Sequence, residues 1–251
     1  MNKMGRWLRL LIALGLAGAT MTSAQSGFRV ERYETDVPYD GRFTFVRLRW
    51  GRGSTFSGGM SNAWNHDYPR AEQHLSQILK EVTFIDLHTD GALILALDDP
   101  DLFKYPIAYM WEPGYWSLTD REAGRFREYL QKGGFAIFDD FDGEQWNNFE
   151  AQMRRVLPEG RFVKLDETHT VFDTFFRMKT IDFPDPRLGT HPTYFGIFED
   201  NDPAKRLMVI ANYNADVAEY WEWSGSGLFP FDSSNEAYKL GVNYMVYGLT
   251  H

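Results

Sequence analysis

The chain of 251 residues contains no cysteine, and this absence removes two kinds of site at once. Without thiolates there is neither a cysteine nucleophile nor a cysteine metal site. Disulfides are excluded as well, so the fold has to be stabilised by its hydrophobic core.

Positive charge is also scarce. The 26 Lys and Arg residues face 35 Asp and Glu residues, which gives a formal net charge of −9. A balance of this sign disfavours binding to nucleic acids and to anionic membrane surfaces. We therefore expect no nucleic-acid partner.

Long apolar runs are missing after the N-terminal region, which itself resembles a secretory signal peptide. Residues 1–24 combine three basic residues, an apolar core from Leu10 to Ala19, and small residues up to Ala24. We predict cleavage near Ala24 and export, to the periplasm or out of the cell, with no transmembrane segment afterwards. An uncleaved N-terminal anchor is the alternative.

After a polar extension at 25–41, residues 42–251 are predicted to form one α/β domain. Short apolar runs alternate with amphipathic helical patterns, as in a mostly parallel sheet covered by helices. The expected strands are 43–49, 105–110, 135–139, 194–199 and 207–212, with weaker candidates at 83–88, 93–97 and 161–165. The expected helices are 70–81, 119–132, 143–157 and a last one from about Asn235.

Three helix starts carry specific signals. Thr119 with Glu122, and Ser233 with Glu236, have the spacing of capping boxes. Asp142 is predicted to be the N-cap of the helix over 143–157.

Acidic residues follow several of the predicted strands. Glu112 follows 105–110, and Asp139 and Asp140 follow the run Phe135–Phe138. In open α/β sheets ligands bind outside the carboxyl ends of the strands, so these residues are candidate ligand-binding residues. Asp139 and Asp140 point in opposite directions if the strand continues, so at most one faces a given crevice. Glu199 and Asp200 also follow a strand, but their sequence context favours an exposed turn.

A glycine-rich loop at 51–59 precedes two further candidates, His66 and Asp67. The loop fits neither the Walker pattern nor the dinucleotide pattern, so a ligand-covering loop is favoured over a phosphate site. His66 could then face the crevice. Asp67 either joins it there or simply favours the N-terminus of the next helix.

No complete catalytic set is visible. The pairs His88–Asp90 and His169–Asp173 have usable spacing for metal ligands but recruit no third ligand. A G-x-S-x-G elbow is missing. Catalytic residues, cofactor and metal therefore stay unassigned.

Several longer motifs resemble the domain-of-unknown-function 4159 family, from about Phe43 to His251. The resemblance is carried by FTFVRLRW, YPIAYMWEPG, YLQKGGFAIFDDF, GIFEDNDPAKRLMVIANYN and LGVNYMVYGLTH. That family is similar in fold to class I glutamine amidotransferases. The resemblance implies a flavodoxin-like, doubly wound, mostly parallel sheet with helices on both faces. The turn near Asp139 and Asp140 is closest in position to the nucleophile elbow, but it carries acids in place of a thiol.

Two functions remain open. The first is a binding module of the cell envelope, without amidotransferase activity, for a protein partner or a small polar ligand. The second is a carboxylate-dependent hydrolase, with or without a metal ion, of a sugar or similar polar substrate. In that case Glu112 would be the acid and Asp140 would stay ionised.

Overall fold

The computed structural model describes residues 37–51, 63–185 and 187–251. The predicted signal peptide, most of the polar extension and most of the glycine-rich loop lie outside these residues.

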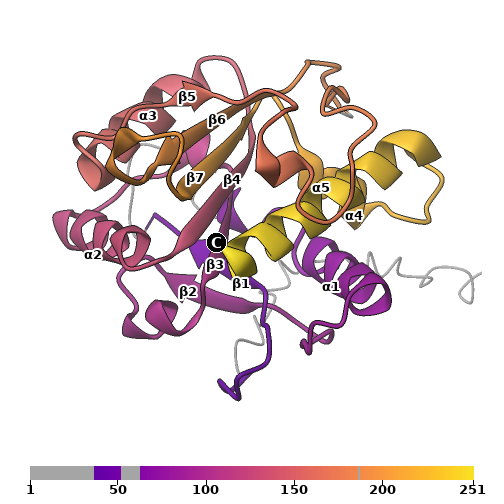
Figure 1. Cartoon of the computed structure of the whole chain (residues 1–251), viewed down its shortest axis with the longest axis horizontal. Helices are drawn as coiled ribbons and strands as arrows, with labels where there is room; N and C mark the ends of the chain where they lie inside the picture. The colour runs from indigo at the N-terminus through magenta and orange to yellow at the C-terminus, as the bar shows by residue number, and fades with distance from the viewer. Residues whose placement is uncertain (1–36, 52–62, 186) are drawn as a thin grey trace, which may run out of the picture. The chain divides into compact units, whose positions relative to one another are not determined.

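Seven strands form one mixed sheet in the order β2-β1-β3-β4-β7-β6-β5 (Figure 1). The five strands from β2 to β7 in this order run parallel, whereas β6 is antiparallel to β7 and β5 is antiparallel to β6. The expected α/β class with a mostly parallel sheet is therefore confirmed. The strands are β1 Val46–Arg49, β2 Leu93–Ala96, β3 Ile107–Trp111, β4 Phe135–Phe141, β5 Val163–Lys164, β6 Thr193–Phe198 and β7 Leu207–Tyr213.

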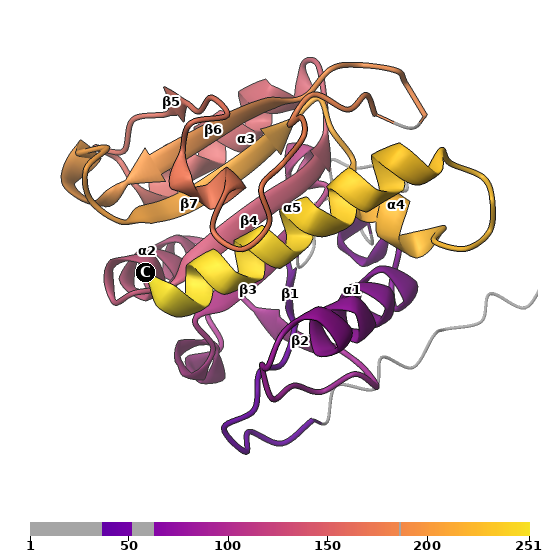
Figure 2. The same cartoon turned by 45° about the vertical axis from the view of Figure 1, so that its right-hand side comes forward.

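Helices cover both faces of this sheet (Figure 2). Because side chains alternate along a strand, Phe135 and Ile137 of β4 join one core while Ala136 and Phe138 join the other. The first core includes residues of α1, α4 and α5, and the second includes residues of α2 and α3. The helices are α1 Arg70–Val82, α2 Asp120–Gln131, α3 Gln145–Val156, α4 Val217–Glu222 and α5 Phe231–Thr250.

Two strand predictions need correction. β4 continues to Phe141, so its acidic residues belong to the strand itself. The segment 83–88 is not a strand, since its pairing is a single bridge between Phe43 and Leu87. Phe84 in this segment is fully exposed, whereas Ile85 and Leu87 pack against the core without forming a ladder.

The helix starts are partly as predicted. Thr119 and Glu122 form the expected capping box. Asp142 is not the N-cap of α3, because that position is Glu144 and the Asp142 backbone N–H donates to Gln145 Oε1. The second predicted box is also wrong. α5 begins at Phe231, and Glu236 lies inside it, accepting a hydrogen bond from the Lys179 backbone.

The remaining short helices connect these elements. They are η1 Ala63–Asn65, η2 Pro100–Lys104, η3 Pro113–Tyr115, η4 Thr170–Phe172 and η5 Glu199–Asn201. Among the described residues, no helix has the length and apolar character needed to cross a bilayer.

Candidate functional site

The carboxyl end of β4 is irregular, and this irregularity separates its two aspartates. The register between β4 and β7 shifts between Phe138 and Phe141. Asp140 has a positive φ of 60°, and its N–H donates to the Ala215 carbonyl at 3.1 Å. A bulge of this kind changes the direction of a side chain and is common beside functional sites.

Asp139 is held entirely by internal hydrogen bonds. It is fully buried and accepts from the Tyr109 hydroxyl at 2.6 Å and from Asn212 Nδ2 at 3.0 Å. The backbone N–H groups of Val217 and Ala218, at the start of α4, also donate to it, each at 3.0 Å. Burial raises its pKa to about 6, so the carboxyl is still ionised at neutral pH. Asp139 therefore ties β4 to β3, β7 and α4.

Glu112 comes directly after β3 in a left-handed conformation, with φ 50° and ψ 46°. Its N–H donates to the Asp139 carbonyl at 3.1 Å, so the strained residue is fixed to the neighbouring strand. The residue is only 6% exposed, and burial raises the pKa of its carboxyl. Strain at a non-glycine residue persists only where the surroundings enforce it, and such residues cluster at functional sites.

Arg47 of β1 positions the segment that carries His66 and Asp67. It is fully buried, pairs with Glu72 of α1, and donates to the carbonyls of Trp64 at 2.7 Å and His66 at 2.8 Å. The guanidinium lies 3.4 Å from the centre of a ring of Trp111. The indole Nε1 of Trp111 in turn donates to Asp67 Oδ2 at 2.9 Å.

The imidazole of His66 lies between two acids. Its Nδ1 is 2.8 Å from Glu112 Oε1 and 3.7 Å from Asp140 Oδ2. These two carboxylates, Asp140 first, raise the pKa of His66 to about 10, so it is a cation at neutral pH although 43% of its side chain is exposed.

Asp216 reaches the same place from the connection between β7 and α4. Its Oδ1 caps the N–H of Glu219 at 3.0 Å, and it is 2% exposed. Arg187 crosses from a loop that precedes β6: its Nη2 is 2.7 Å from Asp140 Oδ1 and 2.8 Å from Asp216 Oδ2. Burial raises the pKa of Asp216, and the acids around Arg187 raise the pKa of its guanidinium.

Four acids thus meet at the carboxyl ends of β3, β4 and β7, and we call Asp67, Glu112, Asp140 and Asp216 the acidic cluster. His66 and Arg187 are the cations that contact it. Burial raises the pKa of Asp67, as it does for Glu112 and Asp216. Four ionised carboxylates would exceed the charge of the two cations, and the raised pKa values show that burial favours protonation of three of these carboxyls.

The donor atoms of the cluster are close enough to share a cation. One ligand atom each from His66, Glu112 and Asp140 lie within 4.8 Å of one another. The same holds for Asp67, Asp140 and Asp216, so Asp140 belongs to both sets. A third set joins Asp67 to Glu219 and Glu222 of α4.

Four of the five residues singled out from the sequence come together here: His66, Asp67, Glu112 and Asp140. Asp139 is adjacent but is occupied by the hydrogen bonds described above. Sequence reasoning missed Arg47, Arg187 and Asp216. Asp216 carries a usable signal, because it follows β7 and precedes the apolar start of α4. Nothing near Arg187 in the sequence indicates its target.

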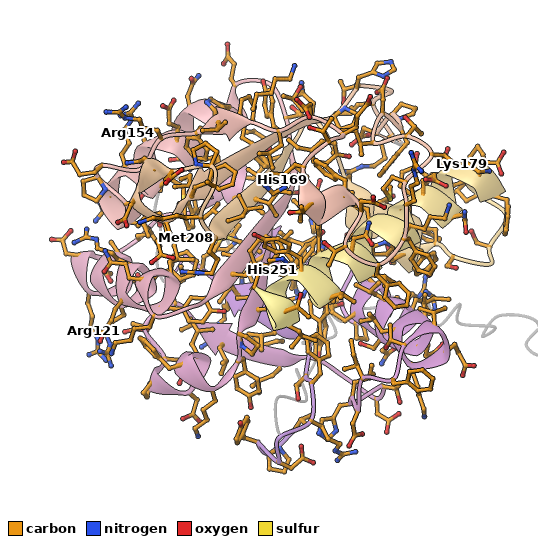
Figure 3. All side chains as sticks on the ribbon, viewed as in Figure 1. Arg121, Arg154, His169, Lys179, Met208 and His251 are labelled. Carbon is orange, nitrogen blue, oxygen red and sulfur yellow. The ribbon has the colours of Figure 1, made fainter. Side chains whose placement is uncertain are left out.

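Within residues 37–51, 63–185 and 187–251, neither histidine pair considered from spacing joins a third ligand. His88 Nε2 contacts Asp40 at 3.1 Å, and His169 Nδ1 accepts from the Val171 backbone. His169 and His251 instead line a separate cavity of about 640 Å³ (Figure 3). In the predicted turn at Glu199 and Asp200, Asp200 is exposed as expected and Glu199 is partly buried.

Comparison with known proteins gives a family. The model for the domain of unknown function DUF4159 matches residues 44–249, so the chain belongs to this family. No curated protein matches the chain.

Proposed function

We propose that this domain is an exported binding module of the cell envelope that takes a small, positively charged ligand at the acidic cluster. The observation that carries the proposal is the convergence of Asp67, Glu112, Asp140 and Asp216 from separate segments of the chain. A buried group of like charges is costly unless cations or hydrogen bonds compensate it, which favours a ligand of opposite charge.

The order of the parallel strands supports this location. Reading β2-β1-β3-β4-β7 gives the flavodoxin-like order, in which ligands bind at the carboxyl ends of the strands. We extend the proposal to a doubly wound fold like that of class I glutamine amidotransferases. Glutamine hydrolysis is not part of it, since the chain has no cysteine to serve as nucleophile.

A backbone feature points to the same place. Asp67, Glu112 and Asp140 all have positive φ angles, of 63°, 50° and 60°. Left-handed conformations cost free energy in residues other than glycine, so three of them at one site favour a functional role.

One observation favours the alternative, a carboxylate-dependent hydrolase. Glu112 and Asp140 flank the same imidazole, and their donor atoms lie within 4.8 Å. A close carboxyl pair with one raised pKa is the arrangement that retaining glycosidases use. Release of nitrophenol from a panel of nitrophenyl glycosides, lost in Glu112→Gln, would favour this function over binding alone.

A thermal-shift experiment tests the binding proposal. The full chain is heated with divalent cations, polyamines, amino sugars and arginine, beside Asp140→Asn and the control Asp200→Asn. Asp200 is also an aspartate with positive φ, but it lies in an exposed turn. We expect at least one cation to raise the Tm of the wild type and of Asp200→Asn, but not of Asp140→Asn. Equal responses of all three proteins, or none, would contradict the proposal.

A further inference from the structure

Two buried carboxylate oxygens in the acidic cluster lack a hydrogen-bond donor. Within the described residues neither Asp140 Oδ2 nor Asp216 Oδ2 accepts a hydrogen bond, although the two residues are only 5% and 2% exposed. Buried carboxylate oxygens are normally saturated, so Asp140 Oδ2 indicates a missing partner, whereas Asp216 Oδ2 has only its ion pair with Arg187. The nearest cationic atoms are His66 Nδ1, 3.7 Å from the first, and Arg187 Nη2, 2.8 Å from the second.

The two residues that carry these oxygens belong to a set with the geometry of an ion site. Asp67, Asp140 and Asp216 each offer a carboxylate oxygen, all within 4.8 Å of one another. Three carboxylates without nitrogen or sulfur form a hard donor set, which suits Mg²⁺, Mn²⁺ or Ca²⁺. The hydrogen bond from Trp111 Nε1 fixes the carboxylate of Asp67. The cap that Asp216 forms on α4 fixes Asp216, so both donors are already oriented.

Arg187 places a positive charge where such an ion would bind. One nitrogen of its guanidinium bridges Asp140 Oδ1 and Asp216 Oδ2. A metal ion on these same two oxygens would take the place of this nitrogen, and an ion on the other oxygens of the two carboxylates would be repelled by the guanidinium charge. Binding of the ion therefore disfavours this position of Arg187. The side chain of Arg187 is 46% exposed on a loop, so it is able to move into solvent.

We propose that Asp67, Asp140 and Asp216 form a binding site for one divalent cation of the Mg²⁺ or Mn²⁺ type, and that Arg187 is the internal counter-ion which this cation displaces. The inference rests on the proposed function, because it names the ligand of that same site. It adds one requirement of its own, namely competition between Arg187 and the metal.

The competition gives variants with opposite effects. Asp140→Asn removes a ligand, and we expect the affinity for Mn²⁺ to fall by at least about 100-fold, since even indirect partners of metal ligands contribute about 10–100-fold. Arg187→Gln removes the competitor, and we expect Mn²⁺ to bind about tenfold more tightly. A merely electrostatic attraction to acids would strengthen with Arg187→Gln too, but would not be lost with a single Asp140→Asn.

The test is a Mn²⁺ titration of the full chain, after treatment with EDTA, followed by the electron paramagnetic resonance signal of free Mn²⁺. Mg²⁺ and Ca²⁺ are added as competitors, and circular dichroism confirms that every variant is folded. Asp200→Asn is the matched control. The proposal expects one site in the wild type and in Asp200→Asn, a tighter site in Arg187→Gln and none in Asp140→Asn.

Other outcomes separate the two proposals. If Mn²⁺ does not bind, or binds equally to Asp140→Asn, the metal inference is overturned. If an organic cation then still stabilises the wild type but not Asp140→Asn, the proposed function stands without the metal. If neither kind of cation depends on Asp140, both proposals fail.

Discussion

Two strands of this sheet end in almost the same sequence and lead to opposite surroundings. FAIFDD occupies 135–140 at the end of β4, and FGIFED occupies 195–200 at the end of β6. The second acid of each pair is an aspartate in a left-handed conformation, with φ 60° at Asp140 and 54° at Asp200. Asp140 is nevertheless buried in the acidic cluster, whereas Asp200 is exposed and pairs with Lys205 at 2.6 Å.

The direction of the strand explains this difference. β4 is parallel to β3 and β7, so its carboxyl end lies beside theirs. β6 is antiparallel to β7, and its last residue, Phe198, pairs with Leu207 at the beginning of β7. The same local turn is therefore placed at opposite ends of the sheet. Only at one of them do acids from other segments meet it.

The largest difference in stability is expected between variants of Asp139 and of Glu199, the first acids of the two pairs. Asp139→Ala leaves four buried donors without their acceptor, so we expect the free energy of unfolding to fall by about 3 kcal/mol or more. Glu199→Ala removes only a contact of 3.6 Å with Arg206 at the surface, and we expect a loss below about 1 kcal/mol. Urea denaturation measures both, and similar losses would contradict the role given to Asp139.

Arg187, which pairs with Asp140, should also contribute more to stability than Lys205, which pairs with Asp200. Without divalent ions, Arg187→Gln leaves Asp140 and Asp216 buried with no guanidinium between them, at a cost of about 2 kcal/mol, because Arg187 itself is half exposed. Lys205→Gln breaks an exposed surface pair and should lower the free energy of unfolding much less than Arg187→Gln does. The measurement is urea denaturation in EDTA. An Arg187→Gln variant as stable as Lys205→Gln would show that the acidic cluster does not need Arg187 as a counter-ion.

A smaller, pH-dependent effect on stability should distinguish the acidic cluster from the turn at Asp200. The pKa of His66 is raised from 6.5 to about 10, so its protonation stabilises the folded state. This contribution is complete below pH 6.5 and is lost as the pH rises through 10. In EDTA, the difference in unfolding free energy between the wild type and His66→Gln should therefore shrink between pH 6.5 and 10. The corresponding difference for Lys205→Gln should stay flat up to about pH 9, because Asp200 raises the pKa of Lys205 above 10.5.

The smallest effect is expected at Asp200. Asp200→Asn keeps a residue that tolerates positive φ, and its ion pair is exposed, so stability should change by less than about 0.5 kcal/mol. Its response to Mn²⁺ in a thermal-shift measurement should equal that of the wild type. A reduced response would show that Asp200 contributes to cation binding, which contradicts a site at the acidic cluster.

Local sequence patterns were sufficient for much of the fold and for part of the site. Apolar runs followed by acids located β3, β4 and the side chains of Glu112 and Asp140, because parallel strands bring such ends together. The capping box of Thr119 with Glu122 could also be predicted, because its two residues are only three positions apart. The start of α5 was misplaced because its first residue, Phe231, is 81% exposed and adds nothing to an apolar face.

What sequence reasoning missed depends on contacts between distant segments. Arg187 lies 47 positions from Asp140, in a loop with no periodic pattern. The antiparallel direction of β6 is set by its pairing with β7, which the run FGIF does not encode. The short α4 spans six residues, too few to show a helical period. Its first N–H groups are bound by Asp139 from a distant strand, in addition to the local cap by Asp216.

The most direct test of the account is a crystal structure of the full chain grown with Mn²⁺, with anomalous scattering to locate the ion. The account predicts one anomalous peak within coordination distance of oxygens from Asp67, Asp140 and Asp216, with the guanidinium of Arg187 moved away from Asp140. A structure in which Arg187 still bridges Asp140 and Asp216 and no peak lies beside them would contradict it.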